Sequence, residues 1–286
     1  MTSQPEFEIA GRRIGDGCPC FVIAEAGVNH NGSLDRALQL VDCAADAGAD
    51  AVKFQTFKAS AIATEHAAQA SYQQRNTGGG RTQLQMLSAL ELSRDDHHRL
   101  IERCRQRGVL FLSTPFDEAS AEMLDQLNVA VFKIPSGEVT NLPFLKLVAG
   151  FGRPMIVSTG MCRLGEVEDA VDTIRGVGNE AFALLHCVSD YPANPADVNL
   201  RAMQTLRAAF GKPVGYSDHT LGIEVGLAAA ARSVRPGKAL HSGSFPSRPR
   251  PQSVTGTGRT AASGRRCSHR RISAGVGNEA TRSVRT

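Results

Sequence analysis

The chain has 286 residues, of which 42% are hydrophobic, and a formal net charge of +4 at pH 7. This length supports one large core or two modest ones. No apolar run is long enough to span a bilayer, and Met1–Gly11 lacks the basic start and apolar core of a signal peptide, so we expect no membrane partner. The seven cysteines are odd in number and scattered, which predicts reduced thiols in a cytoplasmic protein.

The charge is divided unevenly along the chain. Arg232–Thr286 holds eleven Arg, one Lys and a single acid, whereas Met1–Ala231 holds 20 basic and 27 acidic residues. Some basic tails bind nucleic acid. This one is rich in Ser, Gly and Pro, has one aromatic residue, Phe245, and shows no helical periodicity, so we predict no nucleic-acid partner. We predict one domain over residues 1–231 and a disordered basic tail over residues 232–286.

Short apolar runs that end abruptly in polar residues predict the strands. After a lead-in strand over Glu6–Arg13, there are seven such runs: Phe21–Ala26, Ala51–Gln55, Val109–Ser113, Val129–Ile134, Met155–Ser158, Phe182–Val188 and Val214–Ser217. Segments with apolar residues at helical spacing follow them. These are Ser33–Gly48, Ser93–Gly108, Asp117–Leu127, Asn141–Gly150, Leu164–Arg175, Val198–Phe210 and Leu221–Ala231. A long polar loop, Lys58–Arg81, interrupts the series, and loops of this length are usually functional or mobile.

Strands that alternate with helices predict an α/β fold with a parallel sheet. The even spacing, together with the lack of a Rossmann glycine fingerprint, favours a (β/α)8 TIM-type barrel over an open doubly wound sheet. One strand is missing, because only seven of the eight have a sequence signal.

Polar residues at the strand ends predict a site, because the carboxyl ends of barrel strands meet at one mouth. They are Glu25, Lys53, Gln55, Ser113, Thr114, Lys133, Ser136, Glu138, Ser158, Thr159, His186, Ser189, Tyr191, Ser217, Asp218, His219 and Thr220. Two lysines with several hydroxyls suit a small, multiply charged anion. Carboxylates with an imidazole suit metal ligation or proton transfer. A single lysine or histidine is more often structural, but an unpaired buried ammonium is costly, so the whole set favours a site.

Seven motifs carry a family resemblance. They are AEAGVNHNG (Ala24–Gly32), VKFQTF (Val52–Phe57), FLSTPFD (Phe111–Asp117), FKIPSGE (Phe132–Glu138), IVSTGM (Ile156–Met161), LLHCVSDYPA (Leu184–Ala193) and GYSDHT (Gly215–Thr220). In this order they resemble the sialic acid synthase family. The resemblance implies a (β/α)8 barrel followed by a small antifreeze-like (SAF) domain. It also implies a homodimer that condenses phosphoenolpyruvate with an N-acylmannosamine-type aldehyde, giving a nine-carbon 2-keto sugar acid and phosphate.

The resemblance also implies a role for each matching position on the phosphoenolpyruvate side. Lys53, Thr114 and Lys133 match the positions that hold the carboxylate. The positions around the phosphate are matched by Ser136, Ser158 and Ser217, and by Ser189, where many relatives carry Asn.

On the sugar and metal side, His219 matches one of two histidines that bind Mn²⁺ or Mg²⁺. Glu25 matches the carboxylate that orders the metal's water or the sugar, and Glu138 matches a polar partner near the reacting carbons. The implied catalytic residues are therefore Glu25, Glu138 and His219. Further sugar contacts are implied for Gln55, Tyr191 and Asn76.

The resemblance stops near Ala231. A relative would continue with an eighth strand ending in Glu-Lys-His-Phe, whose histidine is the second metal ligand, and then with the antifreeze-like domain. Shifted by one base, degenerate codons for Gly237–Gly243 allow Glu-Lys-His-Phe-Thr-Leu. We therefore interpret approximately Arg232–Thr286 as out-of-frame sequence and expect no eighth strand there. Two alternatives to an active synthase stay open: a catalytically inactive remnant of one, and another phosphoenolpyruvate-condensing or aldolase barrel.

Overall fold

Eight parallel strands form the centre of the protein. The structure is a computed structural model that describes residues 7–15, 17–65, 82–232 and 240–244. The strands are β3 (Phe21–Gly27), β4 (Ala51–Thr56), β5 (Leu110–Pro115), β6 (Phe132–Ile134), β7 (Met155–Ser158), β8 (Phe182–Cys187), β9 (Val214–Asp218) and β10 (Leu240–Ser244). Their order is β5-β4-β3-β10-β9-β8-β7-β6, and the two end strands, β5 and β6, are also in contact. The predicted (β/α) barrel is confirmed.

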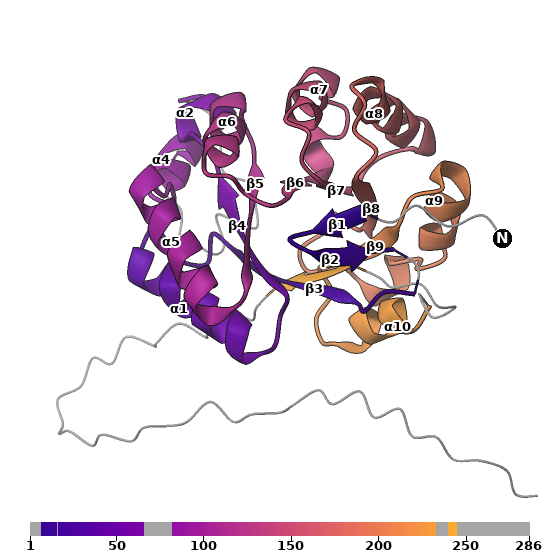
Figure 1. The fold of residues 1–286 in the computed structure, drawn as a ribbon, viewed down its shortest axis with the longest axis horizontal. Coiled ribbons are helices and arrows are strands. Elements are labelled where there is room, and N and C mark those ends of the chain that lie inside the picture. Colours follow the sequence, from indigo (N-terminus) through magenta and orange to yellow (C-terminus); the bar gives the residue numbers. More distant parts are fainter. Residues whose placement is uncertain (1–6, 16, 66–81, 233–239, 245–286) are drawn as a thin grey trace, which may run out of the picture. The chain divides into compact units, whose positions relative to one another are not determined.

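Helices surround the strands (Figure 1). They are α1 (Leu34–Asp46), α2 (Ala59–Ile62), α4 (Gln83–Ser88), α5 (Arg94–Arg107), α6 (Glu118–Gln126), α7 (Leu142–Gly150), α8 (Leu164–Gly176), α9 (Ala202–Phe210) and α10 (Glu224–Arg232), with 3-10 turns η1 (Ser136–Glu138) and η2 (Pro195–Asp197). The side chains of Ser33, Ser93 and Asp117 cap α1, α5 and α6 by accepting from backbone N–H groups of the first turn. Within the described ranges, no helix has the length and apolarity to cross a bilayer.

The lead-in segment differs from its prediction. It forms an antiparallel hairpin of β1 (Phe7–Ile9) and β2 (Arg12–Ile14). Ala10 and Gly11 make the turn, both with positive φ (48° and 77°), as tight hairpin turns require. Ile9 and Ile14 pack in one cluster with inward-facing residues of the barrel strands, so the hairpin covers the amino end of the barrel. The sequence predicted a single strand instead of a hairpin because Ala-Gly is not among the residue pairs that strongly indicate a hairpin turn.

The expectation that no eighth strand follows Arg232 was wrong. Leu240–Ser244 forms β10, which pairs in parallel with β3 on one side and β9 on the other. Two neighbouring strands with open edges supply backbone hydrogen bonds to any segment of suitable length, whatever its hydrophobic pattern. Residues 245–286, most of the predicted disordered tail, lie outside the described residues.

Side chains that face alternately outward and inward along the strands form two apolar layers. Outward-facing residues such as Val52, Phe54 and Phe132 pack in the cluster between strands and helices. The inward-facing residues near the amino ends form a second apolar cluster, which includes Ile23, Ala51, Leu112, Val131, Ile156, Ala183 and Leu185. Because side chains alternate with a period of two, the next inward positions belong to the polar strand ends. The apolar layer is therefore the floor of the mouth.

Candidate active site

Lys53 lies buried on the inner face of β4. It forms an ion pair with Glu25, which is opposite it in register on β3. Its Nζ also donates a hydrogen bond of 3.4 Å to Thr114 Oγ1 on β5. The second carboxylate oxygen of Glu25, Oε1, is buried and has no hydrogen-bond partner among the described residues. An unsatisfied buried carboxylate oxygen is costly, so this group is poised to accept from a ligand or water.

Lys133 lies on the inner face of β6 and is also buried, but no carboxylate of the described residues forms an ion pair with it. Its Nζ donates to Ile134 O and to Ser158 Oγ, both at 2.6 Å. Burial is the largest cause that lowers the pKa of Lys133, and the positive charge of Lys53 lowers it too; Cys187 and Glu25 raise it, and the net value is about 7. A negatively charged ligand would supply the counter-charge that the described residues do not place beside the Lys133 ammonium group.

Serine side chains from three strand ends surround this position. Ser158 ends β7 and bonds Lys133, and Ser217 near the end of β9 is in register with Cys187 of β8. Ser136 begins η1, and its Oγ accepts a hydrogen bond of 2.9 Å from the N–H of Gly160. Hydroxyl groups so placed are donors for an anion held by the lysines.

His219 follows β9 and carries the imidazole of the site. Its Nδ1 lies 2.6 Å from Val188 O and 3.8 Å from Cys187 Sγ. A carbonyl acceptor at Nδ1 favours the Nδ1–H tautomer, which leaves the Nε2 lone pair for a ligand. Burial lowers the pKa of His219, but Cys187, Val188 O and Glu25 outweigh it and the net shift is upward. The ring of Tyr191 lies against the imidazole, with 4.3 Å between centroids.

The described residues at the mouth do not form a complete metal site. Among the residues that the structure describes, no three His, Cys, Asp or Glu side chains come together in a way that could hold a metal ion. His219 Nε2 is an available imidazole donor, but the residues around it do not make up a ligand set. The described residues therefore do not fit a metal by themselves.

The structure brings most of the predicted residues to one end of the barrel, with three qualifications. Glu138 is half-buried in η1 and accepts a 2.8 Å hydrogen bond from Asn141, the residue that caps α7. His186 faces outward, where its Nε2 lies 2.5 Å from Val198 O, so its role is structural. Asn76 lies outside the described residues. Gln55 lies at the mouth, in register with Thr114.

Two residues of the site were missed by sequence reasoning. Cys187 was interpreted only as a reduced thiol, but it ends β8 beside His219 and Ser136. Burial raises the pKa of Cys187, and contacts with His219, Lys133 and Ser136 outweigh this, so the net shift is downward. Gly160 lies in the motif Ile156–Met161, but the sequence predicted no role for it. The sequence signal available for both residues was their position at or just after the end of a predicted strand.

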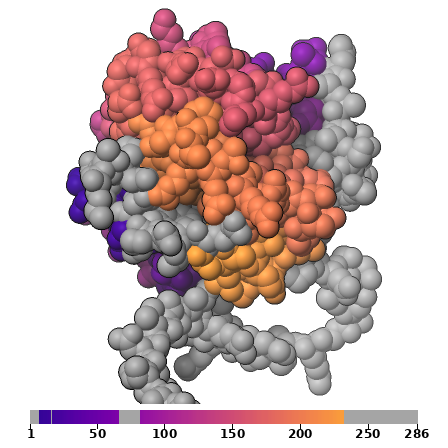
Figure 2. Space-filling view, turned by 90° about the vertical axis from the view of Figure 1, so that its right-hand side faces the viewer, coloured from indigo at the N-terminus to yellow at the C-terminus, as the bar shows by residue number. Residues whose placement is uncertain are grey.

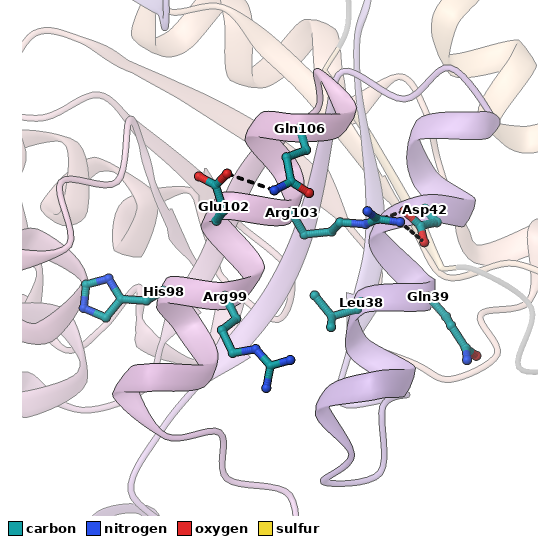
Figure 3. Close-up of a pocket in the computed structure, with 8 residues that line it drawn as sticks. All are labelled: Leu38, Gln39, Asp42, His98, Arg99, Glu102, Arg103 and Gln106. Carbon is teal, nitrogen blue, oxygen red and sulfur yellow. Dashed lines mark hydrogen bonds and ion pairs between the residues drawn. The ribbon is translucent and has the colours of Figure 1, made fainter.

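A groove of about 510 Å³ lies elsewhere, between α1 and α5 (Figure 3). It is lined by polar and charged side chains, and Arg103 is paired with Asp42 across it. None of the predicted site residues lines this groove, so it is separate from the barrel mouth.

Known proteins resemble this chain over the same region. The model of the NeuB family matches residues 40–234. The N,N'-diacetyllegionaminic acid synthase of Legionella pneumophila is 53% identical over 215 residues, which are 74% of this chain and 60% of that protein. The Campylobacter jejuni protein of the same name is 50% identical over 73% of this chain and 64% of its own length. The chain thus spans about three fifths of the length of these curated relatives.

A solved structure agrees with both the fold and the family. The N-acetylneuraminic acid (sialic acid) synthetase of Leptospira borgpetersenii superposes with a TM-score of 0.73 at 35% identity, covering 85% of this chain and 78% of that one. The family match covers more than half of the chain. The chain belongs to the NeuB family, the sialic acid synthase family that its strand-end motifs resemble.

Proposed function

We propose that the barrel mouth binds phosphoenolpyruvate and that the enzyme condenses it with an N-acylated, mannosamine-type aldehyde sugar. The observation that carries this proposal is the pair of buried lysines. Lys53 is neutralised by Glu25, whereas the acceptors of Lys133 among the described residues, Ile134 O and Ser158 Oγ, are both neutral. A carboxylate placed between the two ammonium groups and Thr114 would complete this charge arrangement.

The proposed reaction follows from the groups around that carboxylate. The phosphoenolpyruvate methylene forms a carbon–carbon bond to the aldehyde carbon, water adds to the former enol carbon, and phosphate leaves with its bridging oxygen. The products are a nine-carbon 2-keto sugar acid and inorganic phosphate. Fixed ammonium and hydroxyl donors would stabilise the negative charge that moves onto the departing phosphate.

The metal, the acceptor sugar and the cellular location are further parts of this proposal. A divalent metal, Mn²⁺ or Mg²⁺, would contact His219, but it would need further ligands that the described residues do not supply. The acceptor is proposed to be a diacetamido sugar before N-acetylmannosamine, because relatives at 53% and 50% identity are named N,N'-diacetyllegionaminic acid synthases. Cys104, Cys162 and Cys187 are free thiols, which supports a cytoplasmic location.

The test is phosphate release that depends on the sugar. Phosphoenolpyruvate and Mn²⁺ are supplied with each acceptor or with none, to this chain and to a version frame-corrected near Gly237. We expect sugar-dependent release from the corrected version, little from the chain as given, and at least a tenfold loss in Lys133→Met. Equal release from both versions would show that the out-of-frame interpretation is wrong. No sugar-dependent release from either would contradict the synthase proposal and favour another barrel chemistry.

A further inference from the structure

Gly160 lies at a point where two hydroxyl groups from different strand–helix units converge. It is buried just after β7, and its N–H donates to Ser136 Oγ at 2.9 Å. A Cβ on Gly160 would lie 2.5 Å from Ser189 Oγ, 2.9 Å from Ser136 Oγ and 3.1 Å from Cys187 O. The first two distances are shorter than real contacts of a Cβ atom. The missing side chain is therefore what allows both hydroxyls to approach this point.

Glycine is required at position 160 because a Cβ atom has no space there, and not because of the backbone conformation. The φ angle of Gly160 lies outside the left-handed region, so the backbone itself would accept any residue. Gly32 is a different case, because its φ is +74° and a Cβ would meet the backbone oxygen of Ala89 at 2.1 Å. The atoms nearest to Gly160 are side-chain hydroxyls.

The hydrogen bond from Gly160 also orients Ser136. With one lone pair of Oγ occupied by the backbone N–H, the Ser136 proton is free to point to an acceptor. The acceptor offered by the protein is the thiol of Cys187, which is a weaker acceptor than an anionic oxygen. Ser189 brings a second hydroxyl to the same place, and Lys133 reaches Ser158, two residues before Gly160.

We propose that Gly160 is a positioning residue for the phosphate group of the substrate. By leaving its side-chain position empty, it lets Ser136 and Ser189 present their hydroxyls together to one phosphate group. This inference rests on the proposed function, since it assigns the phosphate end of the phosphoenolpyruvate site.

The contacts predict an unusual response to Gly160→Ala. Ser136 and Ser189 each have a single side-chain torsion before the hydroxyl, so both can rotate away from a methyl group at small expense to the fold. The backbone oxygen of Cys187, at 3.1 Å, has to move by only a few tenths of an ångström. The rotation would nevertheless remove both donors from the phosphate.

The experiment measures calorimetric affinities for inorganic phosphate, phosphoenolpyruvate and pyruvate, together with Tm. The variants are Gly160→Ala, Ser189→Gly, their combination, and Gly165→Ala, a control at which a Cβ meets nothing within 4 Å. We expect Gly160→Ala to bind phosphate and phosphoenolpyruvate at least tenfold more weakly, with pyruvate affinity changed less than twofold and Tm kept. In the Ser189→Gly background the same change should weaken binding less than threefold, because the closest clash is gone.

The opposing outcomes are distinct. Unchanged phosphate affinity, an equal loss for pyruvate, or failure of Gly160→Ala to fold would overturn the positioning role. An equally large loss in the Ser189→Gly background would also overturn it. If the parent protein binds inorganic phosphate but not phosphoenolpyruvate, the proposed function is contradicted. The positioning role of Gly160 is then tested by the phosphate affinities of the variants alone. Failure of the parent to bind either ligand overturns both.

Discussion

Lys53 and Lys133 occupy comparable inner positions on β4 and β6, but the protein treats their charges differently. Lys53 has the carboxylate of Glu25 beside it, whereas the described acceptors of Lys133 are uncharged. Burial lowers the pKa of Lys133, and the positive charge of Lys53 lowers it further. An anion bound between the two lysines therefore favours the protonated form of Lys133.

The affinity for phosphoenolpyruvate should depend on pH through Lys133. Its pKa of about 7 in the free site means that it is largely neutral at pH 8 and above. A bound anion favours the charged form, so binding requires uptake of a proton and weakens as pH rises above 7, by up to tenfold per pH unit. Affinities measured from pH 7.5 to 9, where the phosphate stays dianionic, test this. Lys133→Arg is the control, since Arg stays protonated. The same pH slope in both proteins would show that Lys133 is already charged when free.

At this scale the sequence predicted the charged residues better than the uncharged ones. A lysine inside an apolar strand, such as Lys53 or Lys133, is conspicuous because burying it unpaired is unfavourable. A glycine or cysteine in such a strand is ordinary, so Gly160 and Cys187 became informative only when their neighbours were known. Glu138 was predicted near the reacting carbons, a role that is untested, and the structure adds its bond to Asn141.

Among the elements, the strands with an apolar-then-polar pattern were predicted within a few residues, and β7 coincides with its prediction. Such a pattern follows from burial on both faces of a barrel strand, so it is visible in the sequence. The hairpin and β10 were missed for another reason. β10 contains Gly and Ser and depends on backbone pairing with both neighbours, which single-strand patterns do not report.

A proline in β10 tests whether this strand closes the barrel. Ser242 is in register with Ile23 of β3 and with Ser217 of β9, so Ser242→Pro removes a backbone donor from a strand paired on both sides. We expect Tm to fall by at least about 4 °C, as for a loss of one to two kcal/mol in a domain of this size. Ser253→Pro, in the tail predicted to be disordered, should leave Tm unchanged. Equal Tm values for both variants and the parent would contradict the place of β10 in the barrel.

At the scale of the whole molecule, the charged side chains on the inner face of the described barrel strands lie at one end. The hairpin covers the amino end with apolar side chains, and the lysines, Glu25 and His219 lie at the carboxyl end. Figure 2 shows the later part of the described barrel, coloured orange, on one face of the molecule. The relatives are longer than this chain, since it spans 60% and 64% of the first two. The residues proposed to bind the anion lie on or just after β4 to β9, which are all described.

The most direct test of the central claim is the binding of phosphoenolpyruvate to this chain without the sugar. Calorimetry on the parent, Lys53→Met and Lys133→Met should show one site per barrel. Each substitution should weaken it by about 1.5–3 kcal/mol, roughly ten- to a hundredfold, as expected for a charge-assisted hydrogen bond. Arg103→Met, in the outer groove of Figure 3, is the matched control and should bind as the parent does. Parent-like affinity in both lysine variants, or a loss in Arg103→Met as large as theirs, would contradict an anion site at the barrel mouth.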